Sequence, residues 1–143
     1  MSNLSRFLKQ NKKMKENTTY KATKSLTDEK GNPLDWIIKP ISTKENDVIR
    51  DECVTEIPVK GKVGVYRQKL NTSKYIAKLI VASVVEPNLY DKELQDSYGV
   101  MSAEDLIKEM IDDPGEYSEF GVFIQNFNGF TETIDEEVEE AKN

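Results

Sequence analysis

The sequence predicts a single α+β domain, because two β-hairpin signals lie in its first half and helical patterns dominate its second half. The length of 143 residues is that of one domain. Neither an internal repeat nor a low-complexity linker divides the body. We therefore expect three parts, which are a basic amphipathic N-terminal helix over 1–16, an α+β core over 17–131 and a disordered acidic tail over 132–143.

The N-terminal part carries a small apolar stripe. Leu4, Phe7 and Leu8 are spaced i, i+3 and i+4, as on one face of a helix. This stripe is too small to hold a helix on its own, so we expect it to dock on the body of the same chain or on a partner. The polar, β-branched residues 17–24 then predict an edge strand or a linker.

A turn signal organises the next segment. Lys-Gly-Asn-Pro at 30–33 precedes an apolar strand over 34–39, and Leu26 before the turn is its expected hairpin partner. Ser42 or Thr43 should cap the helix that follows. The inner face of this helix is predicted at Val48, Ile49 and Cys53.

A second hairpin and a buried helix come next. Residues 57–70 alternate around two glycines, which is typical of a β-hairpin with Val63 and Val65 on one face. Thr72 or Ser73 should cap a helix over 74–85 that is apolar nearly all round and therefore central, with Pro87 ending it.

Three shorter helical patterns fill the second half. They cover residues 90–98, the segment after the expected cap Ser102, and residues 116–127. The last pattern carries Phe120, Phe123, Ile124 and Phe127, and an Asn-Gly pair at 128–129 should cap its C-terminus.

Composition excludes several kinds of chemistry. The chain has no histidine, so Ser-His-Asp and Cys-His catalysis and histidine metal sites are absent. Its one cysteine, Cys53, permits neither an internal disulfide nor a cysteine zinc site, and we expect it in the core. No apolar run approaches the roughly 20 residues that span a bilayer, and the N-terminus lacks a signal-peptide core. We expect no enzyme activity, no cofactor, no metal, no membrane partner and a cytoplasmic location.

Charge is distributed unevenly along the chain. Residues 1–24 hold seven lysines and arginines and one glutamate, whereas residues 132–143 hold one lysine and six acidic residues. A basic head could contact nucleic acid, but the acidic body repels phosphate, so we favour a solvated head. The head could also pair with the acidic tail, within one chain or between subunits.

The aromatic residues near the C-terminus have two interpretations. The stripe of Phe120, Phe123 and Phe127 forms either the core or a docking face, and the core is the favoured choice. Phe130 follows the expected cap and is better placed to contact a partner. From the residues alone, the chain is best interpreted as an interaction protein without catalytic chemistry.

The order of several short motifs resembles phage tail assembly chaperones of PBSX-like prophage elements, the XkdN-like proteins. The motifs are Ser-Leu-Thr-Asp-Glu-Lys-Gly-Asn-Pro at 25–33, Trp36, Lys-Pro-Ile at 39–41, residues 78–89, Glu-Leu-Gln-Asp-Ser-Tyr-Gly-Val at 93–100, Pro-Gly-Glu-Tyr at 114–117 and Asn-Gly-Phe at 128–130. The resemblance covers about residues 4 to 130. The motif at 93–100 is either a binding loop or a structural corner, with Asp96 capping and Gly99 turning the chain.

The resemblance implies a role in tail assembly. Similar proteins bind the long tape-measure protein before the tube assembles, keep it soluble, can recruit tail tube subunits, and are absent from the mature tail. We expect the partner-binding residues to be Leu4, Phe7, Leu8, Phe123, Phe127 and Phe130. The alternatives are that these residues close the core or a homo-oligomer interface, and that the protein is a structural tail component or a nucleic-acid-binding regulator.

Overall fold

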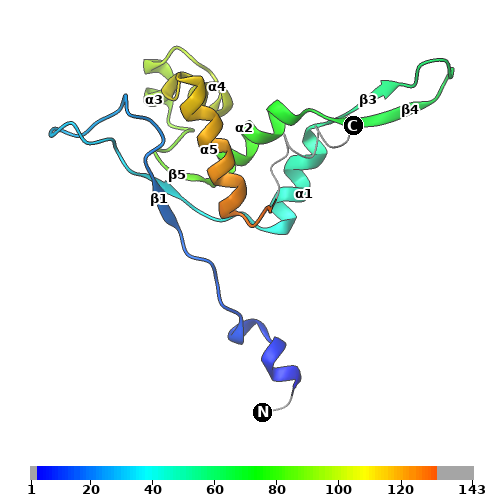
Figure 1. The fold of residues 1–143 in the computed structure, drawn as a ribbon, viewed down its shortest axis with the longest axis horizontal. Coiled ribbons are helices and arrows are strands. Elements are labelled where there is room, and N and C mark those ends of the chain that lie inside the picture. The colour runs from blue at the N-terminus through cyan, green and yellow to red at the C-terminus, as the bar shows by residue number, and fades with distance from the viewer. Residues whose placement is uncertain (1–2, 132–143) are drawn as a thin grey trace.

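The computed structural model describes residues 3–131, and the predicted acidic tail lies outside the described residues. The fold is α+β, as predicted, with two small antiparallel sheets and five α-helices in this part of the chain (Figure 1). The elements in chain order are η1 (Leu4–Phe7), η2 (Lys9–Asn11), β1 (Thr18–Tyr20), β2 (Trp36–Ile38), α1 (Thr43–Glu52), β3 (Val54–Pro58), β4 (Tyr66–Leu70), α2 (Thr72–Ser83), β5 (Val84–Glu86), α3 (Lys92–Ser97), α4 (Ala103–Met110) and α5 (Pro114–Phe127).

The larger sheet has the order β1-β2-β5, with both pairs antiparallel. The central strand β2 is almost wholly buried, since Trp36 and Ile38 are 2% and 0% exposed. The expected hairpin at this turn is confirmed only at its base, where Leu26 accepts a hydrogen bond from the Leu34 N–H at 2.9 Å and Thr27 forms an isolated antiparallel bridge with Pro33. The Asp28 carboxylate closes the turn by accepting from the backbone N–H groups of Lys30 and Asn32. The strand β2 itself pairs with β1 and with the distant β5.

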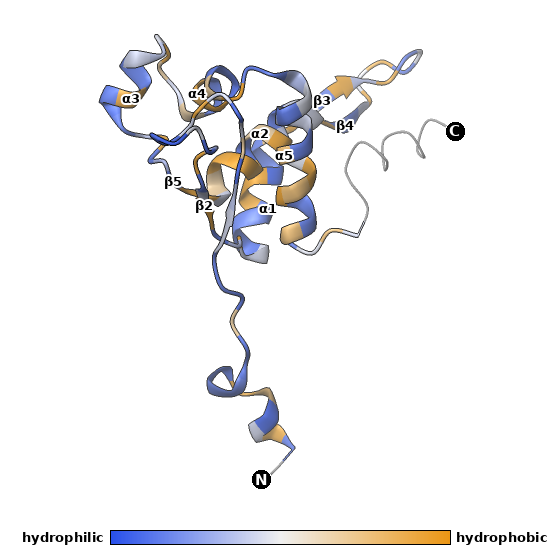
Figure 2. Ribbon diagram, turned by 60° about the vertical axis from the view of Figure 1, so that its left-hand side comes forward, coloured by the Kyte–Doolittle hydropathy of each residue, from blue (hydrophilic) through white to orange (hydrophobic). Residues whose placement is uncertain are grey.

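The core lies between this sheet and a helical layer in which α2 and α5 pack together. Figure 2 shows hydrophobic positions gathered on these two helices. A Cβ at Gly121 of α5 would lie 3.1 Å from Ile76 Cγ2 of α2, so the glycine permits the close approach. Lys78 of α2 forms ion pairs with Glu52 of α1 at 3.2 Å and Glu104 of α4 at 3.3 Å.

Helix α2 differs from its prediction at both ends. Asn71 caps it by accepting from the Lys74 N–H at 3.1 Å, in place of Thr72 or Ser73. The helix ends at Ser83, because Val84 and Val85 adopt an extended conformation and form β5. The β-branched valines favour this change, and the Lys39 N–H hydrogen-bonds to the Ser83 carbonyl at 2.8 Å.

Helix α1 and the β3–β4 hairpin confirm part of their predictions. Ser42 and Glu45 form a capping box at the start of α1, and Cys53 is 1% exposed. Val48 is 57% exposed, so its assignment to the inner face was wrong. Val63 and Val65 lie in the connection between the two strands, where the Val65 carbonyl accepts a hydrogen bond from the Val59 N–H at 2.9 Å. The hairpin projects from the body (Figure 1).

The second half follows the predicted helical pattern. Leu106 and Ile107 of α4 and Phe120 of α5 are all fully buried. The end of α5 forms a Schellman motif, in which the N–H groups of Gly129 and Phe130 donate to the carbonyls of Asn126 and Gln125. Gly129 takes the left-handed conformation that this motif requires, with φ of 88°.

The N-terminal segment does not form the continuous helix that was expected. It makes two single 3₁₀ turns, η1 and η2, separated at Leu8, whose φ and ψ of −66° and 148° are extended. None of its residues is buried in either turn. The segment therefore lacks the tertiary packing that would hold an α-helix of this length.

Candidate partner-binding surfaces

A group of exposed apolar side chains lies on the N-terminal segment, residues 3–16, which we call the arm. Leu4 is 71% exposed, Phe7 85%, Leu8 41% and Met14 72%. The arm extends away from the body in both ribbon views (Figures 1 and 2). Leu4, Phe7 and Leu8, three of the residues predicted to face a partner, are thus exposed to solvent and do not pack against the core of their own chain.

The arm is attached to the body at the end of α5. The Lys15 ammonium donates to the Phe127 carbonyl and lies 5.0 Å from the centroid of the Phe127 ring. A cation over an aromatic face contributes about 0.5–1 kcal/mol at an exposed site. This contact fixes where the arm leaves the body.

An aromatic stack joins β1 to α5. The Tyr20 ring stacks with Phe123 at a centroid distance of 4.2 Å and with Phe120 at 5.1 Å. Phe127 stacks on Phe123 at 6.0 Å. Burial and the nearby carboxylates raise the pKa of Tyr20 above its ordinary value. The predicted residues Phe123 and Phe127 are therefore half-buried, and each presents one part of its ring to its own chain.

Phe130 is also half-buried and lines a small cavity at the end of α5. The cavity has a volume of about 250 Å³ and is bounded by residues 41–43, Asn46 and residues 128–130. The structure brings Phe123 and Phe127 together on α5, whereas the arm extends away from α5 (Figure 1).

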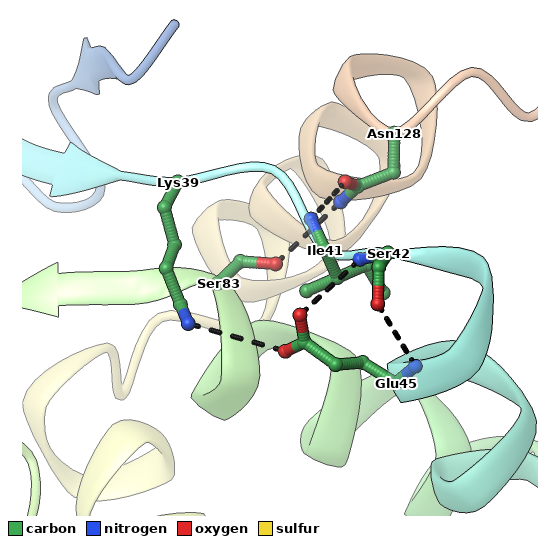
Figure 3. Close-up of polar contacts among 6 residues, drawn as sticks. All are labelled: Lys39, Ile41, Ser42, Glu45, Ser83 and Asn128. Carbon is green, nitrogen blue, oxygen red and sulfur yellow. Dashed lines mark hydrogen bonds and ion pairs between the residues drawn. The ribbon is translucent and has the colours of Figure 1, made fainter. Parts of the chain in front are cut away.

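Asn128 organises this end of the molecule, a role that its motif alone did not reveal. Its side-chain carbonyl accepts from the Ile41 N–H at 2.9 Å, and its amide donates to the Ile124 carbonyl at 2.9 Å and to the Ser83 hydroxyl at 3.5 Å. Figure 3 shows the bonds of Asn128 to Ile41 and Ser83 beside the capping box of Ser42 and Glu45, and the Glu45 carboxylate also lies 3.9 Å from the Lys39 ammonium. One side chain thus joins the start of α1 to the ends of α2 and α5.

A wide groove lies between β5 and α3, and we call it the β5–α3 groove. Its volume is about 740 Å³, and it is lined by residues 85–88, Asp91, Glu93, Leu94 and Ser97. The groove therefore joins residues of two of the motifs described above, residues 78–89 and residues 93–100, in one surface. Sequence reasoning missed this groove, because the strand β5 that forms one wall was predicted to be helix.

The motif at 93–100 also has the features of a structural corner. Asp91 caps α3 by accepting from the Leu94 N–H at 2.9 Å, so the expected cap Asp96 was wrong, and Asp96 instead pairs with Lys92 at 2.6 Å. The Gln95 amide donates to the Leu89 carbonyl at 2.8 Å. Gly99 turns the chain with φ of 68°, as predicted.

Three findings concern metal binding, thiol reactivity and membrane crossing within residues 3–131. No group of three or more acidic or thiol side chains within residues 3–131 is placed to hold a metal ion. Burial raises the pKa of the Cys53 thiol, which disfavours its reactive thiolate. Among the helices of residues 3–131, none has the length and apolar composition needed to cross a bilayer.

Comparisons with known proteins agree with the motif pattern. The chain is 30% identical over 121 residues to the phage-like element PBSX protein XkdN of Bacillus subtilis, which covers 85% of this chain and 80% of that protein. It is equally similar to the uncharacterized protein YqbN of the same organism. The crystal structure of YqbN has the same fold, with a TM-score of 0.74 and 24% identity over 91% of this chain and 98% of that one.

The family comparison covers nearly the whole chain. The model of the phage XkdN-like tail assembly chaperone family matches residues 4–142, which include the arm from Leu4 onward, the β5–α3 groove and Asn128. With this extent of agreement, and with the XkdN relative beside it, the chain belongs to the XkdN-like family of phage tail assembly chaperones.

Proposed function

We propose that this chain binds a tape-measure protein during tail assembly and keeps it soluble until the tail tube forms around it. The observation that carries the proposal is the exposed apolar arm on a member of a chaperone family. Leu4, Phe7 and Leu8 are its primary contacts. A tape measure exposes long apolar helices, and an apolar arm can cover part of such a surface.

The size of the arm suits reversible binding. Burying a leucine or phenylalanine side chain contributes about 1.5–3 kcal/mol. The free energy gained by burying three such side chains is partly offset by the loss of translational and rotational freedom on association and by the ordering of the arm. Binding through this arm is therefore moderate in strength, which allows the chaperone to leave when tube subunits replace it.

The half-buried aromatic residues have a secondary place in the proposal. Phe123 and Phe127 stabilise the aromatic stack that anchors the arm, and their exposed edges, together with Phe130, extend the contact surface near the root of the arm. The net charge of −6 helps to keep a complex with an apolar client in solution. We place the protein in the host cytoplasm, with the tail tube protein as a second partner, and expect it to be missing from mature tails.

Co-expression with the tape-measure protein of the same phage element tests this proposal. We expect the tape measure to be insoluble alone and to co-elute with the chaperone in size-exclusion chromatography. The Phe7→Ser variant should lose most of the soluble complex while keeping its thermal stability, because Phe7 is 85% exposed. The matched control is Val48→Ser on α1, which removes a 57% exposed apolar side chain elsewhere.

Two results would contradict the proposal. A tape measure that stays insoluble beside the folded chaperone would remove the proposed activity. Recovery of this chain from purified tails at a stoichiometric level would identify a structural tail component instead.

A further inference from the structure

The β5–α3 groove is lined by both apolar and acidic side chains. We call the apolar ones, Val85, Pro87 and Leu94, its floor, and the acidic ones, Glu86, Asp91 and Glu93, its rim. Within the described chain, no ion pair joins these three carboxylates to a lysine or arginine. The one lysine on α3, Lys92, is paired with Asp96. The groove therefore presents net negative charge beside an apolar surface.

The walls of the groove are fixed by the fold. One wall is β5, an outer strand of the three-stranded sheet, so the side of β5 that faces away from β2 pairs with no other strand of residues 3–131. The other wall is α3, which its Asp91 cap and the bond from Gln95 to Leu89 hold in place. A groove of about 740 Å³ is large enough for several side chains of an incoming segment.

The arm has the complementary chemistry. It carries five lysines and arginines and one glutamate in residues 3–16, interleaved with the exposed Leu4, Phe7 and Leu8. Apolar side chains can enter the floor of the groove while the cations face its carboxylates. Such a match of opposite charges favours the correct pairing and speeds association.

The arm and the groove of one chain are separated in the fold. The Lys15–Phe127 contact holds the root of the arm at the C-terminal end of α5, whereas β5 lies at the opposite edge of the sheet from β1. In both ribbon views the arm points away from α3 (Figures 1 and 2). Docking of the arm in the groove of its own chain would require it to reverse direction around the body.

We propose that the arm of one copy of this chain docks in the β5–α3 groove of a second copy. The contact joins two different surfaces, so it produces either a closed ring or dimer in which arms are exchanged or a growing chain of copies. This inference goes beyond the proposed client binding and is tested without any client.

Sedimentation of the full-length protein across a concentration series provides the first test. We expect the mass to rise above that of the 16.4 kDa monomer and to fall again at high salt, because salt screens exposed charges. Reversing the rim with Glu86→Lys and Glu93→Lys should weaken association about tenfold, since two attractive contacts become repulsive. The matched control, Glu109→Lys with Asp112→Lys, changes two exposed carboxylates at the end of α4 and should associate as the parent does.

A charge exchange distinguishes a lost contact from a misfolded variant. Adding Lys9→Glu and Lys12→Glu to the reversed groove restores opposite charges in the arm and should restore association. A parent protein that stays monomeric at every concentration would overturn the proposal. The proposal would also be overturned if the combined variant folded but did not regain self-association, or if the control variant lost as much self-association as the rim variant.

Disulfide capture then tests the contact itself. Two proteins, one with Leu8→Cys in the arm and one with Val85→Cys in the groove, are mixed and oxidised. The native Cys53 is buried and stays out of the reaction. We expect mixed dimers between the two variants, and few when Val85→Cys is replaced by Met101→Cys, a fully exposed site outside the groove lining. Equal capture at both sites would refute the assigned groove.

Discussion

Replacing Tyr117 with phenylalanine should stabilise the protein. The Tyr117 hydroxyl is buried and has no hydrogen-bond partner among residues 3–131. Desolvation of a hydroxyl without a compensating hydrogen bond costs about 1–3 kcal/mol in protein mutational data. The phenyl ring of the variant keeps the shape and packing of the tyrosine ring. We therefore expect the free energy of unfolding to rise by about 1 kcal/mol, which corresponds to roughly 3–4 °C in Tm for a chain of this size.

Urea unfolding at neutral pH measures this change directly. The matched control is Tyr90→Phe, which removes the hydroxyl of a 72% exposed tyrosine and should stay within about 0.5 kcal/mol of the parent. Burial raises the pKa of Tyr117. Because the folded state resists its deprotonation, the parent loses stability as pH rises above about 10, and the advantage of the phenylalanine variant should grow there.

The opposite result would refute the reasoning. If Tyr117→Phe lowered the free energy of unfolding while the control left it unchanged, the hydroxyl would have to donate or accept a hydrogen bond in the native protein. If Tyr117→Phe brought no gain in the free energy of unfolding at neutral pH, and the variant and the parent depended on pH in the same way above pH 10, the hydroxyl would have to be solvated in the native protein.

Two further predictions concern α5. Phe120→Ala should lower the free energy of unfolding by about 3–5 kcal/mol, because Phe120 is fully buried against Tyr20 and Trp36; urea unfolding checks it, and the exposed Val122→Ala is the control. For Glu116, hydrogen bonds from the Thr23 hydroxyl at 2.7 Å and the Lys24 N–H at 2.8 Å lower the pKa of the carboxyl. Its stabilising effect is present above the unfolded pKa of about 4.3 and is lost as pH falls through the lower folded value. Glu116→Gln should therefore destabilise the protein at neutral pH, with a difference from the parent that shrinks in acid, whereas a constant difference would contradict the assignment.

The helices and their buried faces were largely predictable from the sequence, because helix patterns are local. The stripe of α4 and the stripe of α5 each repeat within one segment. Ser42, Ser102 and the Asn128–Gly129 pair also act at the helix ends where capping chemistry places them. These features depend on neighbours within about four residues.

The sheet could not be predicted in the same way. Its three strands have three residues each, which is too short for a recognisable alternation. The partner of β2 on one side, β5, lies nearly fifty residues away in the sequence, and Val84 and Val85 continue an apolar helical pattern until the backbone turns into the sheet. The pairing of β5 with β2 therefore determines where α2 ends, whereas the local apolar pattern alone predicts a helix that continues to residue 85.

Sequence reasoning selected the arm as a candidate binding segment and missed the groove. The spacing of Leu4, Phe7 and Leu8 is a local pattern, so the sequence alone singles out these residues, and the structure shows that they are exposed. The β5–α3 groove brings Val85 together with Leu94 across a turn, and its wall exists only after β5 has paired with β2. The aromatic stack likewise depends on Tyr20, which lies a hundred residues from the phenylalanines of α5.

The two proposals for the arm have a common physical consequence. If Leu4, Phe7 and Leu8 bind a client, they cannot fill the groove of another copy at the same time, so the two associations compete for one segment. Binding of the arm in the groove uses a short surface and charge interactions that salt screens, whereas an extended apolar client offers more apolar surface for the arm to cover. Self-association would then shield the exposed arm while no client is present and release it when one is available. The contact between Lys15 and Phe127 would hold the root of the arm at the end of α5 during this exchange.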